Sequence, residues 1–237
     1  MNLNRLELLI GKDSLEKIKK LKILIVGLGG VGGYTFETLV RSGIENITIV
    51  DFDKVDETNL NRQILTNSNN IGKYKTEVAL ERALLINKNV NINKLNIFLN
   101  KDNIDELNIN QYDYIVDACD SLDTKELLMN YSYKYKIKLI SSLGTAKKMD
   151  ATKLEITTLN KTSYDALAKL LRKRIDKKIQ NKIIVVSSTE KPKDIKSLGS
   201  NSYVPAMSGI LMTNYIINDA LKWLKNLLLI TFMILWT

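Results

Sequence analysis

One stretch constrains this chain more than any other: an apolar segment near residues 22–26 that runs into a glycine turn and then a helix. The glycines have the G-x-G-x-x-G spacing of a nucleotide-binding turn, and they are Gly27, Gly29, Gly30 and Gly32. In such a turn the glycines permit a tight bend, let a phosphate approach the backbone and bring helix against strand. The helix expected near residues 31–42 directs unpaired N–H groups at the bound anion.

A second apolar segment, near residues 47–50, ends in Asp51. An acid about 20 residues beyond the glycines is placed to bind ribose hydroxyls. Without that acid, the glycines would also suit a turn that only packs a helix on a strand. The combination of strand, turn, helix, strand and acid favours a nucleotide site.

Apolar segments of strand and helix type alternate along the first 144 residues, which predicts an α/β fold: a Rossmann-like, doubly wound, mainly parallel sheet. We expect strands near residues 22–26, 47–50, 91–98, 112–120, 138–144, 153–158 and 183–188. We expect helices near residues 5–20, 31–42, 73–86, 104–107, 124–135, 165–179 and 207–223. The last two strands and the strongly basic helix at 165–179 form a C-terminal extension of the sheet. Ligands of such sheets bind at the carboxyl ends of the strands, where Asp51 and Asp120 are expected.

The loop after Asp51 is rich in polar side chains, among them Asn59, Arg62 and Gln63, and Lys75 follows at the next helix. A guanidinium and an ammonium group that converge suit a triphosphate, whose charge they offset. Asp120, at the end of the strand near residues 112–120, could hold a Mg²⁺ ion that bridges the phosphates.

Composition narrows the chemistry further. The 237 residues carry a formal net charge of +9, one cysteine (Cys119) and no histidine. A histidine base, an internal disulfide and a Cys/His zinc site are therefore excluded. The basic balance favours a polyanionic partner, and the cysteine content suits a reducing, cytoplasmic location.

Five motifs together resemble the ubiquitin-activating-enzyme-like, ATP-dependent adenylating superfamily. They are Gly27-Leu28-Gly29-Gly30-Val31-Gly32, Asp51-Phe52-Asp53, Asn59-Leu60-Asn61-Arg62-Gln63, Gly72-Lys73-Tyr74-Lys75 and Asp117-Ala118-Cys119-Asp120-Ser121. The resemblance implies that Asp51 binds ribose, and that Asn59, Arg62 and Lys75 bind phosphates. It also implies a nucleotide-binding role for Asp53 and Gln63 and a Mg²⁺-associated role for Asp120.

The same resemblance bears on assembly and on the catalytic residues. Arg5 resembles an arginine that a partner subunit inserts into the ATP site, which implies a homodimer. The catalytic set is then Arg5, Arg62, Lys75 and Asp120. Sulfur-carrier activators of this superfamily usually have two Cys-x-x-Cys zinc pairs and a catalytic cysteine, and this chain has neither.

The second half of the chain resembles the tRNA threonylcarbamoyladenosine dehydratases. The matching segments include residues 150–157, 161–168, 171–174 and 188–192. Two departures are Ala151 and Ala166, where that family often has proline. By this resemblance the chain uses ATP and Mg²⁺ to dehydrate threonylcarbamoyladenosine next to the tRNA anticodon, and a monovalent-cation requirement is left open.

Residues 161–196 contain eleven Lys or Arg and four Asp or Glu, which suits contact with the tRNA backbone. The predicted tRNA contacts are Arg172, Lys173 and Arg174, although a basic run is also typical of a solvated helix face. A sulfur-relay or carrier protein is a possible further partner.

Three other functions remain open at this point. One is adenylation of a small carrier protein, another is a non-catalytic adaptor that only binds ATP or a protein, and the third is a nicotinamide oxidoreductase.

We expect one domain with a nucleotide-binding half (1–144), a substrate-side half (145–224) and an apolar tail (225–237). The tail is expected to pack against the body or a second subunit rather than a membrane, because ten apolar-dominated residues are too few to span a bilayer.

Overall fold

The computed structural model describes residues 1–235, and the side chains of residues 1–222. Its strands are β1 (Lys22–Val26), β2 (Asn46–Val50), β3 (Asn91–Leu95), β4 (Tyr114–Asp117), β5 (Lys138–Ser142), β6 (Leu154–Thr158) and β7 (Ile184–Ser188). Its α-helices are α1 (Asn4–Ile10), α2 (Lys12–Lys19), α3 (Gly32–Arg41), α4 (Lys75–Ile86), α5 (Leu122–Tyr135), α6 (Ala166–Arg174), α7 (Lys177–Gln180) and α8 (Tyr203–Leu235).

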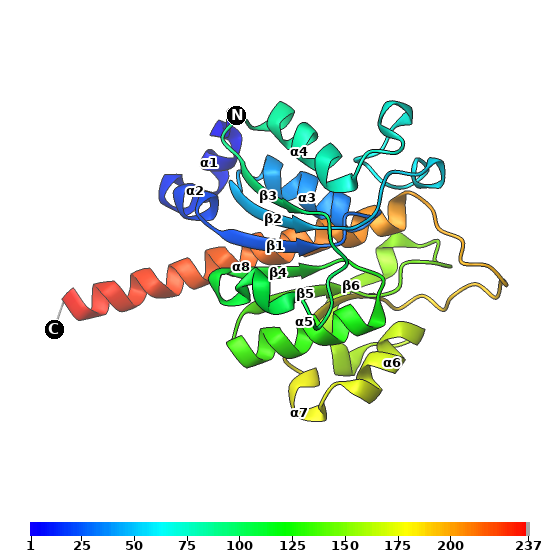
Figure 1. Cartoon of the computed structure of the whole chain (residues 1–237). Helices are drawn as coiled ribbons and strands as arrows, with labels where there is room; N and C mark the ends of the chain where they lie inside the picture. The colour runs from blue at the N-terminus through cyan, green and yellow to red at the C-terminus, as the bar shows by residue number, and fades with distance from the viewer. Residues whose placement is uncertain (236–237) are drawn as a thin grey trace.

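The strands form one seven-stranded sheet with the order β3-β2-β1-β4-β5-β7-β6. Every neighbouring pair is parallel except β6 and β7, which pair antiparallel. Figure 1 shows this sheet running through the middle of the molecule with helices on both sides. The predicted fold class, a doubly wound sheet with a C-terminal extension, is confirmed.

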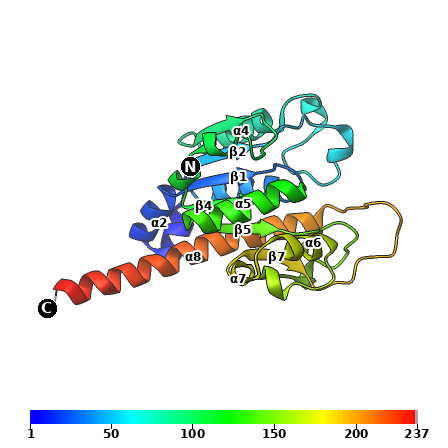
Figure 2. The ribbon, with the colours of Figure 1, turned by 60° about the horizontal axis from the view of Figure 1, so that its bottom comes forward.

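Each face of the sheet has its own hydrophobic core, because successive residues of a strand point to opposite faces. On β1, Ile23 and Ile25 contribute to the core under α2, α3, α4 and α8. Leu24 and Val26 contribute to the core under α5, α6 and α7. Figure 2 shows α5, α6 and α7 together on one side of the sheet. Both faces of the central strands are therefore apolar, as a parallel sheet requires.

Helix α8 crosses α3 at close range. A Cβ atom on Gly209 would lie 2.4 Å from the Val31 carbonyl oxygen, so only glycine allows this approach. Thr35 donates to the Gly209 carbonyl at 3.1 Å, and Thr38 and Thr213 share a 2.6 Å hydrogen bond. The crossing fixes the start of α8 beside the glycine turn that precedes α3.

Two predicted helices are wrong as single elements. The helix expected at residues 5–20 is interrupted at Gly11, whose φ of +85° no helix can contain, and it becomes α1 and α2. The basic helix expected at residues 165–179 breaks at the extended Ile175, after which Asp176 caps α7. Residues 104–107 form a short 3-10 helix instead of an α-helix.

The last helix begins at Tyr203, four residues before the expected start. The prediction that the tail at 225–237 packs against the body concerns side chains outside the described ones. Among the residues that the structure describes, no helix combines the length and apolarity needed to cross a bilayer.

A buried carboxylate links α3 and α4. The Glu37 side chain is 4% exposed and forms ion pairs with Arg41, at 2.7 Å, and with Arg82. Burial would raise the pKa of Glu37, but hydrogen bonds from both guanidinium groups outweigh it and hold this pKa below its ordinary value.

We therefore predict that Glu37→Gln lowers the free energy of unfolding by about 2 kcal/mol at pH 7. A carboxylate with a depressed pKa stabilises the fold above its unfolded-state pKa, so the difference from wild type should shrink as the pH falls below about 4.5. Urea unfolding at pH 7 and pH 4 measures both effects. Glu81→Gln, on α4 and in an exposed pair with Lys73, is the control. An equal loss in both variants would contradict the prediction.

Candidate active site

A cavity of about 950 Å³ opens at the carboxyl edge of the sheet. Ten of the residues predicted to bind nucleotide line it: Gly27, Gly29, Gly30, Asp51, Asp53, Asn59, Arg62, Gln63, Lys75 and Asp120. They follow β1, β2 and β4 or belong to the loop before α4. The crevice is at the position where strand order reverses between β1 and β4, which is the ligand site of doubly wound sheets.

The glycine turn is crowded by backbone atoms at Gly27 and Gly32, whereas the space beside Gly29 is open. Gly27 has a φ of +92°, and a Cβ atom there would lie 2.6 Å from the Ala118 carbonyl oxygen. A Cβ atom on Gly32 would lie 1.8 Å from the Gly27 carbonyl oxygen. At Gly29 the nearest atom would be 3.9 Å away, in the side chain of Gln63. The turn is therefore packed tightly against β4, and its Gly29 face is left for a ligand.

Asp51 is fixed by the backbone of two loops. Its Oδ2 accepts the Leu28 N–H at 2.6 Å, and its Oδ1 accepts the Asp53 N–H at 2.8 Å. Burial raises the pKa of Asp51, while the positive charge of Lys75 and the two N–H donors oppose that rise. Each oxygen keeps a lone pair for a further donor, as ribose hydroxyl groups would supply.

The predicted phosphate-binding residues differ in how they are held. Lys75 is 5% exposed and its Nζ lies 2.7 Å from Asp53 Oδ2. Arg62 donates to the Thr58 carbonyl at 2.7 Å and to Asn61 Oδ1 at 2.8 Å, and it has no carboxylate partner in the described part of the chain. Arg62 thus keeps its full positive charge available to an anion.

Two amide side chains complete this end of the cavity. Asn59 Oδ1 accepts the Asp56 N–H at 3.1 Å and closes a capping box, so its amino group is the part available to a ligand. Gln63 is 6% exposed, and its Oε1 is buried without a hydrogen-bond partner in the described structure. Because buried acceptors are normally paired, this oxygen indicates a missing donor. A nucleotide fits this site, because its phosphates suit the open Gly29 face, its ribose hydroxyls suit the two carboxylate oxygens of Asp51, and a further donor suits the unpaired oxygen of Gln63.

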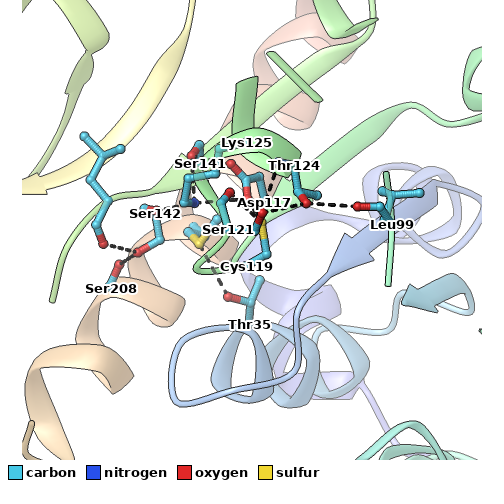
Figure 3. A network of polar contacts seen from close by, with 12 residues as sticks. Thr35, Leu99, Asp117, Cys119, Ser121, Thr124, Lys125, Ser141, Ser142 and Ser208 are labelled. Atoms are coloured by element: carbon cyan, nitrogen blue, oxygen red, sulfur yellow. Dashed lines mark hydrogen bonds and ion pairs between the residues drawn. The ribbon is translucent and has the colours of Figure 1, made fainter. Parts of the chain in front are cut away.

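Asp120 is exposed, lines the cavity and forms no hydrogen bond or ion pair with the described residues. At the end of β4, Asp117 belongs to a buried network that the sequence analysis missed (Figure 3). Lys125 Nζ is 3.0 Å from Asp117 Oδ1 and 2.7 Å from the Ser142 carbonyl, and Ser141 donates to Asp117 Oδ2 at 2.6 Å. The network ties the ends of β4 and β5 to α5.

Cys119 is part of the same network, since its thiol lies 3.1 Å from Asp117 Oδ1. Burial and the charge of Asp117 raise the pKa of this thiol well above its ordinary value. A thiol of this kind stays protonated and is a poor nucleophile.

Arg5 does not line the cavity of its own chain. It lies on α1, beside a smaller hollow formed with Asn2, Leu3 and Arg41. Leu8 and Leu9 of the same helix are 88% and 80% exposed. Any contact of Arg5 with a nucleotide must therefore involve the cavity of another subunit.

The three predicted tRNA contacts are not equivalent. Arg172 is turned inward and donates to Thr162 Oγ1 and to the Thr162 carbonyl. Arg174 pairs with Asp123 at 2.5 Å and with Glu126 at 3.2 Å. Lys173 is exposed and unpaired among the described residues. The guanidinium groups of Arg172 and Arg174 are thus bonded within the chain, and of the three residues only Lys173 has an unpaired charge among the described residues.

The structure also adds an outer end to the cavity, formed after β5, at the start of α6 and in the loop after β7. Lys148 is the buried residue that joins these segments, with Nζ contacts to the carbonyls of Tyr164 (3.4 Å), Ser188 (3.3 Å) and Glu190 (2.8 Å). Burial lowers its pKa, and nearby carboxylates oppose that change. Sequence reasoning had no signal for it, because Lys148 is one of many lysines in a basic half.

The fold and the site define a Rossmann-like nucleotide-binding protein whose glycine turn, acidic acceptors and convergent cations suit a nucleoside triphosphate. The family is defined by comparison: residues 2–229 match the model of the ThiF family, and the chain belongs to that family.

Two dehydratases are similar in sequence. The chain is 34% identical to the tRNA threonylcarbamoyladenosine dehydratase of Bacillus subtilis, over 92% of this chain and 94% of that one. It is 39% identical to the enzyme of the same name from Haemophilus influenzae, over 68% of this chain and 61% of that protein's length. Among solved structures, E. coli tRNA N6-threonylcarbamoyladenosine dehydratase in complex with ATP matches with a TM-score of 0.90 and 31% identity, covering 94% and 95% of the two chains.

The geometry of the turn predicts that Gly29→Ala impairs ligand binding without unfolding the protein. A methyl group there meets no atom closer than 3.9 Å but occupies the face left open to phosphate. We expect ATP affinity to fall about tenfold in calorimetric titration, with Tm lowered by less than about 2 °C.

Gly33→Ala is the matched control. Its Cβ atom would meet Leu65 at an ordinary 3.4 Å, and Gly33 does not line the cavity. Wild-type ATP affinity in Gly29→Ala, or an equal loss in Gly33→Ala, would show that phosphate does not approach the Gly29 face.

Proposed function

We propose that this chain is an ATP-dependent tRNA threonylcarbamoyladenosine dehydratase that activates its substrate by adenylation. The observation that carries the proposal is the similarity to an ATP-bound enzyme of that activity over 94% of the chain, with the nucleotide-type cavity intact. ATP is the cosubstrate, and tRNA bearing the modified adenosine is the substrate. The nucleotide-binding half is assigned to residues 1–144 and the substrate-side half to residues 145–224.

In the first step a carboxylate oxygen of the threonyl group attacks the α-phosphorus of ATP. An acyl-adenylate forms and the bond to pyrophosphate breaks. Arg62 and Lys75 bind the phosphates and offset the charge that moves onto the leaving group. Asp51 holds the ribose, Asn59 joins Arg62 and Lys75 at the phosphates, and Gln63 binds the nucleotide at the Gly29 face. Asp120 would hold Mg²⁺ together with phosphate oxygens, an arrangement common for this ion, and the ion would supply further positive charge.

In the second step the carbamoyl oxygen attacks the activated carbonyl carbon. The bond to AMP breaks, AMP leaves with the carboxylate oxygen, and a proton is released as the ring closes. The nucleoside thereby loses the elements of one water. Neither step needs a histidine base or a cysteine nucleophile, which agrees with a chain that has no histidine and only the buried Cys119.

The proposal predicts that Arg62→Ala and Asp120→Asn each lower ATP-dependent dehydration at least about 100-fold without unfolding the protein. Both side chains line the cavity, Asp120 exposed and Arg62 half-buried, and Arg62 bonds only to its own loop. Mass spectrometry of nucleosides from the modified tRNA, under conditions that preserve the cyclic product, measures the loss of one water.

Lys73→Ala is the control, because Lys73 pairs with Glu81 and does not line the cavity. Near-wild-type turnover in either site variant would remove that residue from the mechanism. Unchanged nucleoside with the wild-type protein, alongside ATP–pyrophosphate exchange with a carrier protein, would overturn the function itself.

We further propose that the active unit is a homodimer in which Arg5 of one subunit reaches the ATP of the other. The support is that Arg5 lies outside its own cavity, on a helix that exposes Leu8 and Leu9. Two apolar side chains of this size in adjacent positions favour burial against a second copy.

Subunit mixing tests this arrangement. Arg5→Ala and Arg62→Ala should each be inactive alone, but a mixed dimer would contain one site with both arginines. Random exchange of equal amounts should restore about one quarter of wild-type activity, since half of the dimers are mixed and each has one intact site. Dimers that form and exchange but recover no activity would contradict a shared site.

A further inference from the structure

The outer end of the cavity has a feature that ATP binding does not explain. Three segments form it: residues 144–148 after β5, residues 164–167 at the start of α6, and residues 191–194 after β7. Tyr164 lies among them, lines the cavity and is still 59% exposed. Its ring and hydroxyl group form no hydrogen bond, ring contact or cation–π contact with the described residues.

The backbone of Tyr164 is strained and held in place. Its φ of +49° lies in the left-handed region, which residues other than glycine rarely adopt. On one side its carbonyl accepts from Lys148 Nζ at 3.4 Å. On the other side Asp165 accepts the N–H groups of Ala168, at 2.8 Å, and of Gly144, at 2.9 Å. Such strain persists only where the surroundings over-determine it, and here it fixes an aromatic ring at the cavity mouth.

Positively charged side chains line the same end of the cavity. Lys147 also has a left-handed backbone, with φ +62°, and its N–H and carbonyl bond to Gly199 and Lys193, each at 2.9 Å. This pairing docks the loop after β7 against the residues that follow β5. Lys191 and Lys193 of that loop line the cavity with exposed side chains that have no carboxylate partner among the described residues.

An exposed aromatic ring that lines the same cavity as unpaired ammonium groups is the chemistry that binds single-stranded nucleic acid, by base stacking and phosphate contact. Resting on the proposed function, we propose that Tyr164 is a stacking platform for an unpaired base of the tRNA substrate at the cavity mouth. Lys191 and Lys193 bind the adjoining phosphates. The platform orients the modified nucleotide so that its threonyl carboxylate enters toward the glycine turn.

The test compares Tyr164→Phe with Tyr164→Asn. Phenylalanine keeps the stacking face, whereas asparagine removes the ring and tolerates the left-handed backbone, so the loop keeps its shape. We expect Tyr164→Asn to raise the KM for tRNA about tenfold with an unchanged Kd for ATP. Tyr164→Phe should stay within about twofold of wild type. The control is Tyr135→Asn, because Tyr135 is an exposed tyrosine at the C-terminal end of α5.

An unchanged KM for tRNA in Tyr164→Asn would overturn the platform. So would an equal defect in Tyr164→Phe, which would assign the effect to the hydroxyl group. Assays with the free modified nucleoside as substrate distinguish whether the stacked base is the modified adenine or a neighbouring base of the tRNA. A raised KM for the nucleoside in Tyr164→Asn means that the ring stacks on the modified adenine itself, and a defect confined to tRNA means that it stacks on a neighbouring base.

The platform and the proposed function can fail separately. If Tyr164→Asn dehydrates tRNA as well as the wild-type protein does, the function stands and the platform is wrong. A wild-type protein that leaves the nucleoside unchanged, but whose binding to an anticodon stem-loop weakens about tenfold in Tyr164→Asn, loses the function and retains the platform. Fluorescence anisotropy of a labelled stem-loop measures that binding.

Discussion

The contact between Gly32 and the Gly27 carbonyl is the constraint on which the rest of the site depends. A side chain at Gly32 would place its Cβ atom 1.8 Å from that oxygen, which is inside any possible contact distance. Because the two backbones touch, β1 passes into α3 through the shortest turn that glycine permits. The turn leaves the Gly29 face open and brings the Leu28 N–H within 2.6 Å of Asp51, so one close approach sets both the phosphate face and the ribose-type acceptor.

The charges around this turn are arranged by the same fold. Lys75 is buried against Asp53, whereas Arg62 is held only by neutral oxygens and keeps its charge for a ligand. The Lys75–Asp53 pair joins a buried lysine to a half-exposed carboxylate, and it adds little to stability because the desolvation of Lys75 opposes the attraction between the charges. Its value to the site is positional: it fixes an ammonium group at the end of the cavity that Asp51 also lines.

Local sequence pattern predicted the sheet and the carboxyl-edge site, because strand periodicity and glycine spacing are local signals, and the family resemblance completed the ten predicted residues that line the cavity. It could not predict the break at Gly11, since a single glycine is tolerated in a helical pattern and only its φ of +85° shows that the helix ends there. It also missed Lys125 and Lys148. Both are buried lysines whose partners are distant in sequence, and nothing local distinguishes them from the other lysines of a basic chain.

The same limit applies to Arg172 and Arg174, which belong to a basic run that reads as one patch. In the fold their guanidinium groups face different partners, Thr162 and the pair Asp123 and Glu126, and charge density along the sequence cannot separate such groups from a free Lys173.

Two residues with strained backbone lie at the outer end of the cavity. Among the described residues, four other than glycine have a positive φ: Asn108, Lys136, Lys147 and Tyr164. Lys136 ends α5 and Asn108 joins two short 3-10 helices, which are ordinary positions for this conformation. Lys147 lies in a turn and Tyr164 in a bend before α6, and both line the outer end of the cavity. A left-handed backbone at Lys147 or Tyr164 costs stability that a glycine there would not cost. The presence of these two side chains therefore indicates that the shape and side chains of the outer end of the cavity matter more to the protein than the lost stability.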